Sequence, residues 1–215
     1  SEYQNDLERL ASGYERIVRF LAFIGLPLSV LLYFTAGEVT LILFGDQWMP
    51  SIPIFRILTL SVGIQIVLSS SGSIFQAAGD TKSLFVCGLF SSVLNVAGIL
   101  LGIFRIGTLQ AVATCITLTF TVNFVQCYWM MYRVTLHRSL RHFAVQLVSP
   151  LAVSVLLIAV LYPLSLLTEG GNIFLTLIVK SIIFFCIFGC YIQLTGEYDI
   201  IGKAKGILNK RKSRG

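Results

Sequence analysis

Lys180 has the most unusual position of any residue that could do chemistry, because it lies inside an apolar run. It is the eighth residue of the run that covers residues 173–194. A lysine in the middle of a membrane helix costs about 2.5–3.5 kcal/mol, so it should face protein or a water-filled cavity. Its charge could attract a negatively charged group of a substrate. Alternatively, its long stem could reach the outer headgroups without any further role.

Five other polar residues inside apolar runs could line the same path. Arg56 lies about one turn into the second run, where it could face a cavity, although anchoring to headgroups is the favoured interpretation. Small amide groups in membrane helices most often form hydrogen bonds between helices and otherwise line cavities. With Lys180, the candidate substrate path consists of Arg56, Asn95, Asn123, Gln126 and Gln65.

No catalytic constellation is evident in the sequence. The two histidines, His137 and His142, lie in a polar loop beside arginines and are expected to face headgroups. The serines of the runs have no histidine partner, and a glycine-rich phosphate loop is absent. Cys186 and Cys190 lie four residues apart, yet packing is favoured over a metal site for them. The sequence therefore predicts no catalytic residue, no metal and no cofactor, and thus a protein that is not an enzyme.

Carboxylates are expected outside the apolar runs. Glu38 and Asp46 are interpreted as solvated residues at the outer surface. A carboxylate that couples transport to protons or sodium would be expected within a span, and none of the runs holds one centrally. If such coupling exists, its acid is expected to lie outside this chain.

The elements that must position these residues are six long apolar segments. Each segment with its flanks reaches the roughly 20 residues that a helix needs to cross a hydrocarbon core of about 30 Å. Because backbone polar groups find no water in lipid, each segment is expected to be a helix. Hydrophobic residues make up 56% of the chain and charged residues 12%. The predicted fold is all-α, a polytopic transmembrane bundle with spans near residues 17–34, 52–78, 84–103, 109–131, 145–161 and 173–194.

The distribution of positive charge predicts the orientation. Thirteen of the 16 lysines and arginines lie in the N-terminal segment, the turn at 79–82, the loop at 132–142 and the tail. The positive-inside rule places these segments in the cytoplasm, so both termini are predicted to be cytoplasmic. The net charge of +6 follows the loops and the tail, which indicates membrane lipids rather than nucleic acid as partners.

Three segments leave alternatives open. Residues 1–16 form an amphipathic lead-in that either lies on the cytoplasmic surface or extends the first span. After Gly37 the chain either ends a long helix that contains Pro27 or forms a short outer turn. The serine-rich stretch 69–73 either packs closely against a neighbouring helix, which we favour, or unwinds beside a cavity. In the turn that follows, Gly79 should end one helix and Asp80 or Thr81 should cap the next.

Several of these segments also carry motifs of a known family. Residues 43–60 hold a Leu43-Phe-Gly turn before a span, and that span leads to Gln76-Ala-Ala-Gly-Asp-Thr-Lys82. The lead-in Gln4-Asn-Asp-Leu-Glu-Arg-Leu10 precedes a span that contains proline. In their order and spacing, these motifs resemble the bacterial polysaccharide and O-antigen flippases of the MOP exporter superfamily. The resemblance covers about the first 130 residues, whereas the last two spans match in hydropathy alone.

The resemblance implies a function and a larger protein. Such flippases have about twelve to fourteen spans in two lobes and translocate undecaprenyl-diphosphate-linked oligosaccharides across the bacterial inner membrane. This chain would be the C-terminal part, and its missing N-terminal lobe would be a partner. Lys180 would then help to attract the pyrophosphate. The expected parts are the lead-in 1–16, a four-helix core 17–131, a basic loop 132–142, two further spans 143–194 and a basic tail 195–215.

Two other functions remain open. One is a MATE-like exporter of small molecules, which a single positive charge within the spans disfavours for cationic drugs. The other is a self-contained membrane scaffold with six spans. The first residue is Ser1 rather than methionine, which favours an incomplete chain over a scaffold.

Overall fold

The computed structural model describes the backbone of residues 2–195 and the side chains of residues 7–195. Within that range the chain contains helices and turns but no strand, and six helices are long and apolar enough to cross a membrane. The predicted all-α fold with six spans is thereby confirmed, and the chain is a multi-pass membrane protein. The basic cluster of the predicted tail lies outside the described residues.

The first span is one continuous helix, α1 (Glu2–Phe44). At about 1.5 Å per residue, its 43 residues are roughly twice as long as a bilayer core requires. Of the alternatives left open, the lead-in therefore extends the first span, and the residues after Gly37 complete the same helix. The helix continues through Pro27, whose ring is buried against neighbouring helices.

The second span is interrupted near its end. A short 3-10 helix (Asp46–Ser51) leads into α2 (Ile52–Leu68), which has Pro53 in its first turn. The helix then breaks at residues 69–70 and resumes as α3 (Ser71–Ala77). The serine-rich stretch is thus partly unwound, while Ser70 also contacts α1 through a hydrogen bond of 3.0 Å with Tyr14.

The turn after α3 has the predicted geometry. Gly79 adopts a φ of +71°, a value that favours glycine. The Asp80 carboxylate accepts a hydrogen bond of 3.0 Å from the backbone N–H of Ser83 and so caps α4 (Thr81–Leu101). The predicted capping is confirmed for Asp80.

The remaining spans form two antiparallel pairs. The helix α4 ends in a π-helical turn (Gly102–Ile106), and a very short link joins it to α5 (Leu109–Met130). The helix α5 in turn ends in a π-helical turn (Met131–Thr135). The second pair consists of α6 (Leu140–Leu167) and α7 (Ile173–Thr195).

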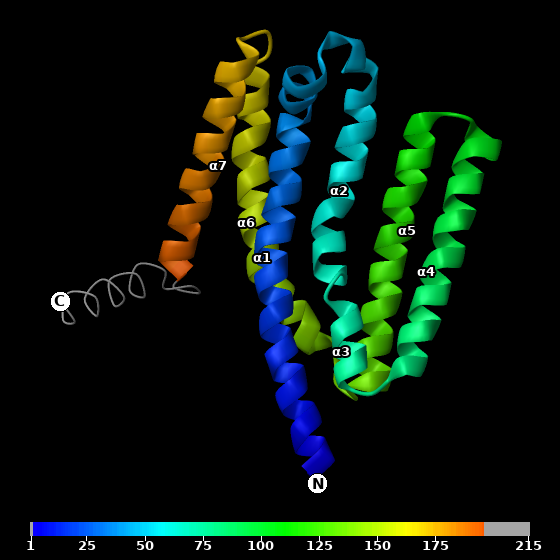
Figure 1. Ribbon diagram of the computed structural model, residues 1–215. Helices are drawn as coiled ribbons and strands as arrows, with labels where there is room; N and C mark the ends of the chain where they lie inside the picture. Colours follow the sequence, from blue (N-terminus) through cyan, green and yellow to red (C-terminus); the bar gives the residue numbers. More distant parts are fainter. Residues whose placement is uncertain (1, 196–215) are drawn as a thin grey trace, which may run out of the picture.

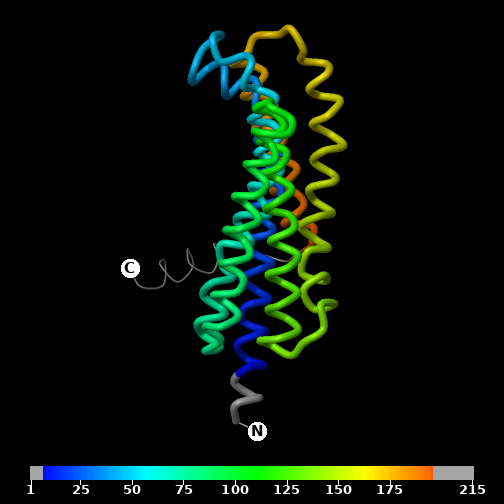
Figure 2. The backbone as a smooth tube through the Cα atoms, turned by 90° about the vertical axis from the view of Figure 1, so that its right-hand side faces the viewer, coloured from blue at the N-terminus to red at the C-terminus, as the bar shows by residue number. Residues whose placement is uncertain are grey.

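The helices stand in a broad, thin bundle (Figures 1 and 2). Across Figure 1 their order is α7, α6, α1, α2, α5 and α4, and α1 packs against α2, α6 and α7. The N-terminus, the α3–α4 turn and the α5–α6 link lie at the lower end of the bundle in that view. These are the segments predicted to be cytoplasmic, so we refer to this end as the inner end and to the opposite one as the outer end. That they face the cytoplasm stays a prediction.

Close backbone approach joins α1 to α2. A Cβ atom added at Gly63 would lie 2.8 Å from the carbonyl oxygen of Gly25 and 2.9 Å from the Cα atom of Leu26. The backbone N–H of Gly63 donates a hydrogen bond of 2.6 Å to the Ser29 hydroxyl. Small residues therefore bring the two helices together, as is typical of helix packing in lipid.

Two clusters of buried apolar side chains hold the bundle on either side of this contact. One lies towards the inner end and joins α1 to α3, α5 and the start of α6 through residues such as Tyr14, Phe75, Tyr128 and Phe143. The other joins α1 to α6 and α7 and contains Phe23, Phe34, Val153, Leu157, Leu161, Phe184 and Ile192. The second cluster adjoins the cavity described next, because Phe34 belongs to the cluster and also lines that cavity.

Candidate functional site

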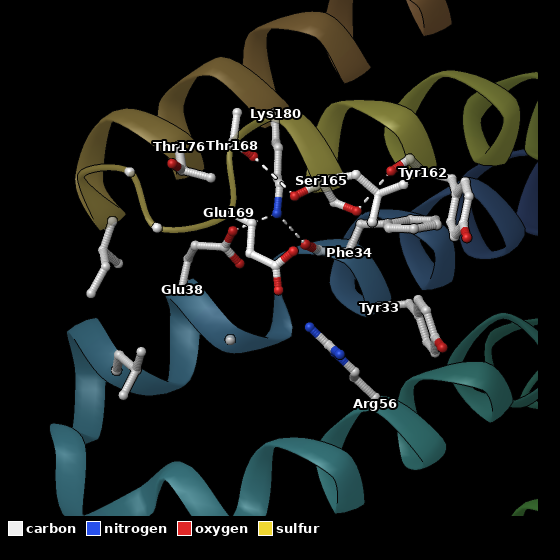
Figure 3. Close-up of a pocket in the computed structure, with 16 residues that line it drawn as sticks. Tyr33, Phe34, Glu38, Arg56, Tyr162, Ser165, Thr168, Glu169, Thr176 and Lys180 are labelled. Atoms are coloured by element: carbon white, nitrogen blue, oxygen red, sulfur yellow. Dashed lines mark hydrogen bonds and ion pairs between the residues drawn. The ribbon is translucent and has the colours of Figure 1, made fainter.

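Lys180 is buried between α7 and α1 instead of reaching the membrane surface. Its side chain is 5% exposed, and its ammonium group donates a hydrogen bond of 2.9 Å to the carbonyl oxygen of Phe34. It also forms an ion pair with the carboxylate of Glu38, one turn further along α1 (Figure 3). The alternative in which the lysine extends to the headgroups is therefore wrong, since its ammonium group is buried and bonded to two groups of α1.

Glu38 corrects an expectation from the sequence. The sequence predicts a solvated carboxylate at the outer surface, but the Glu38 side chain is only 14% exposed and is paired with Lys180. Because α1 continues to Phe44, Glu38 lies inside the first span and not beyond its end. A buried cation is costly unless it is paired, and α1 supplies the required anion. The statement that Lys180 is a lone charge within the spans is consequently wrong as well.

A cavity of about 420 Å³ opens beside this ion pair at the outer end. Its walls come from the end of α1, the start of α2, the end of α6 and the start of α7. This volume falls in the range of about 300–1,000 Å³ that is typical of small-molecule pockets. The polar residues that line it are Glu38, Arg56, Ser165, Thr168, Glu169, Thr176 and Lys180.

Arg56 and Glu169 face this cavity from opposite walls (Figure 3). The guanidinium of Arg56 lies 6.0 Å from the centre of the Tyr33 ring, within reach of a cation–π interaction. Among the described residues, neither the Arg56 guanidinium nor the Glu169 carboxylate has a hydrogen-bond or ion-pair partner. Both groups are thus available to a ligand, and Arg56 lines the cavity instead of pointing away from it.

The structure brings two of the six candidate residues together and leaves four elsewhere. Asn95 accepts a hydrogen bond of 2.8 Å from Thr119 and so joins α4 to α5. Gln65 donates to Ser61 on its own helix at 2.8 Å. These two side chains fit the default interpretation of helix packing and internal hydrogen bonding. Neither lines the outer cavity.

Asn123 and Gln126 lie together on α5, also away from the outer cavity. The Gln126 amide donates weakly to the sulfur atoms of Met130 and Cys87, at 3.7 and 3.8 Å. The side-chain oxygen atoms of Asn123 and Gln126 are buried without a hydrogen-bond partner among the described residues.

Polar contacts also tie the inner end of the bundle together. The Tyr14 hydroxyl lies 3.0 Å from that of Tyr128, which donates to the carbonyl oxygen of Val67 at 3.0 Å. Arg138 forms an ion pair of 3.1 Å with Glu15. These contacts join α1, α2, α5 and the α5–α6 link.

Asp80 adds one further link at the inner end. The Thr135 hydroxyl donates a hydrogen bond of 2.6 Å to its carboxylate. Together with the hydrogen bonds from Ser83, this bond holds the pKa of Asp80 below its ordinary value of 3.8. The capping carboxylate is therefore held in its charged form, and it fixes the α3–α4 turn against the end of α5.

Reasoning from the sequence missed Glu38, Glu169 and Tyr33 as residues of the site. Glu169 lies in the α6–α7 link, where a single glutamate is an ordinary surface residue. A signal for Glu38 did exist, because a buried lysine needs an anionic partner and few acidic residues are available near the spans. Finding it required knowing that α1 does not end at residue 34.

Comparison with known proteins agrees with the resemblance. Residues 1–53 match the family described as polysaccharide biosynthesis protein. The teichuronic acid biosynthesis protein TuaB of Bacillus subtilis is 25% identical over 132 residues, which are 61% of this chain and 26% of that protein. The lipopolysaccharide biosynthesis protein WzxC of Escherichia coli is 24% identical over 174 residues, 79% of this chain and 34% of that protein. No solved structure matches significantly.

The matches cover part of this chain and a smaller part of each relative. The chain spans about a quarter to a third of the length of these two relatives, and the family match covers α1, the 3-10 helix that follows it and the first two residues of α2. The resemblance predicted from the motifs around residues 4–10, 43–60 and 76–82 is confirmed: the chain is similar in sequence to proteins of bacterial polysaccharide biosynthesis.

Proposed function

We propose that this chain is the C-terminal part of a flippase that translocates undecaprenyl-diphosphate-linked oligosaccharides across the bacterial inner membrane. The similarity to two polysaccharide biosynthesis proteins and the six membrane-spanning helices support a role in the membrane stage of that process. A glycan on a lipid carrier cannot cross the hydrocarbon core unaided, because its hydroxyl groups would lose their hydrogen bonds to water.

The observation that carries the proposal is the polar cavity between α1, α2, α6 and α7. It places Arg56, Glu38, Glu169 and Lys180 among helices that are otherwise apolar. Charged groups at such positions are costly and usually mark the path of a substrate or an ion. In this proposal the cavity is part of the substrate path at the outer end, and the missing N-terminal lobe provides the opposite wall.

Export of small cations is a second candidate, because the structure removes the argument against it. A single positive charge in the spans disfavoured cationic substrates, whereas the cavity also contains the carboxylates of Glu38 and Glu169. The names of the relatives favour polysaccharide biosynthesis over this alternative.

Deletion of the gene from its source organism tests the proposal. Surface polysaccharide should decrease, and lipid-linked repeat units should accumulate on the cytoplasmic leaflet. The complete wild-type gene should restore both. Normal polysaccharide together with increased sensitivity to cationic dyes would instead support the export of small cations. No change in either measurement would contradict both functions.

A further inference from the structure

The cavity has a charge balance that bears on which part of a lipid-linked oligosaccharide it could hold. Two cations, Arg56 and Lys180, line it together with two carboxylates, Glu38 and Glu169. Lys180 is already engaged, since its ammonium group donates to the Phe34 carbonyl oxygen and pairs with Glu38. Arg56 is therefore the one cation of the lining whose charge is not balanced by a contact within the protein.

A diphosphate group fits this lining poorly. Each carboxylate would repel the negative charges of a diphosphate, and between helices such repulsion is screened less than in bulk water. Sites for phosphate groups usually gather several arginine, lysine or backbone N–H groups without competing carboxylates. In this cavity Lys180 is already paired with Glu38, and Glu169 lies on the wall opposite Arg56.

A sugar ring fits the same lining well. Its hydroxyl and acetamido groups both donate and accept hydrogen bonds. The unpaired Arg56 guanidinium can donate to such groups, and the unpaired Glu169 carboxylate can accept from them. Tyr33 and Tyr162 add aromatic rings to the lining, against which the C–H faces of a sugar can pack. The mixture of aromatic, cationic and anionic groups suits a ligand that is polar but carries no large net charge.

We infer that this cavity holds a sugar residue of the translocated glycan and not its diphosphate, an inference that rests on the proposed function. Arg56 donates to the sugar, Glu169 accepts from it, and the Lys180–Glu38 pair fixes the wall between α1 and α7. The diphosphate must then be bound by another part of the complete transporter. This assignment differs from the role in pyrophosphate attraction that the resemblance implied for Lys180.

Binding of two separate probes to the complete gene product in lipid nanodiscs tests the inference. The first probe is the free repeat-unit oligosaccharide, released by mild acid from the lipid-linked intermediate of the source organism. The second is farnesyl diphosphate, which carries the diphosphate without any sugar. Arg56→Met and Glu169→Gln should each weaken binding of the free oligosaccharide about tenfold or more, as expected for a lost hydrogen bond to a charged group. Neither variant should change binding of farnesyl diphosphate.

Arg105→Met and Asp46→Asn are matched controls, because both remove exposed charges at the outer end that do not line the cavity. They should leave both affinities unchanged. Weaker binding of farnesyl diphosphate to Arg56→Met would overturn the inference. So would an unchanged affinity of both cavity variants for the oligosaccharide, or a wild-type protein that does not bind it.

A translocation assay separates failure of this inference from failure of the proposed function. Wild-type protein in proteoliposomes should move the whole lipid-linked repeat unit between leaflets. If translocation occurs but the oligosaccharide results fail, the proposed function stands and the assignment of this cavity to sugar is wrong. If the wild-type protein does not translocate the lipid-linked unit, the proposed function itself is wrong.

Discussion

The ion pair between Lys180 and Glu38 makes a quantitative prediction. Replacing Lys180 with methionine leaves the Glu38 carboxylate, which is 14% exposed, without its cation. Removing one partner of a buried ion pair typically costs about 3–5 kcal/mol. Because this carboxylate is partly exposed and lies beside the cavity, water offsets part of that cost. We expect Lys180→Met to lower the free energy of unfolding by about 2–4 kcal/mol.

The converse substitution, Glu38→Leu, should cost a similar amount, because Lys180 is 5% exposed and would lose its anion. The double variant should behave differently. Replacing both charges with apolar residues removes the ion pair and also the burial cost of each charge, so its stability should lie within about 1 kcal/mol of wild type. The two substitutions should therefore be coupled by at least about 3 kcal/mol.

Reversible unfolding in mixed micelles tests these expectations on the wild type, the two single variants and the double variant. The free energy of unfolding can be obtained from far-ultraviolet circular dichroism as SDS is titrated into the detergent. The controls are Lys82→Met and Asp46→Leu, which remove exposed charges and should each change stability by less than about 0.5 kcal/mol. If the double variant loses the sum of the two single losses, the pair is not coupled, and the reasoning about the outer cavity is refuted.

Three further predictions concern packing and the inner end of the bundle. Gly63→Ala should destabilise the protein by about 1–3 kcal/mol in the same unfolding assay, because the added Cβ would collide with the backbone of α1. The control Gly88→Ala should not destabilise it, because its added Cβ meets nothing within 4 Å. Equal stability of the two variants would contradict the packing argument. Tyr128→Phe should lower the free energy of unfolding by about 1–3 kcal/mol, because it removes a buried hydroxyl that contacts Tyr14 and Val67. The control Tyr162→Phe, at an exposed ring, should leave stability unchanged. Unchanged stability of Tyr128→Phe would show that the hydroxyl contacts add nothing. Since the pKa of Asp80 is lowered by folding, its contribution to stability is complete above its unfolded pKa near 3.8 and is lost as the pH falls through the lower folded value. Asp80→Asn should therefore reduce the stability difference between pH 7 and pH 3, measured by thermal unfolding, and an unchanged difference would dismiss this role.

The sequence predicted the spans well because lipid imposes one strong rule on the backbone. Runs of about 20 apolar residues must be helices, so the ends of α4, α5 and α7 could be located to within three residues. The helix α6 begins five residues before and ends six residues after the predicted span. The end of the first span was harder to predict. Gly37 and Glu38 interrupt the apolar pattern, and helix propensity alone gives a weak preference there. The helix nevertheless continues to Phe44, and Glu38 is paired there with Lys180 of α7, 142 residues away in the sequence.

The candidate site was predicted in part because charged groups are costly in lipid. Lys180 stood out because a charge inside a span is costly, and Arg56 stood out because it lies about one turn inside the second span. Their common cavity depends on how α1, α2, α6 and α7 pack, and hydropathy carries no information on that packing. Asn95 and Gln65 have the same polarity as cavity-lining residues, yet their hydrogen bonds go to Thr119 and Ser61. Pairing of this kind follows from three-dimensional contacts.

Reconstitution tests the central claim most directly. The complete gene product should be inserted into proteoliposomes that carry the lipid-linked repeat unit, and the fraction of glycan exposed on each leaflet should be followed over time. The glycan should move between leaflets when the wild-type protein is present and should move more slowly with Arg56→Met or Glu169→Gln. A rate equal to that of protein-free liposomes would contradict transport. A wild-type rate in both variants would show that the cavity does not lie on the path.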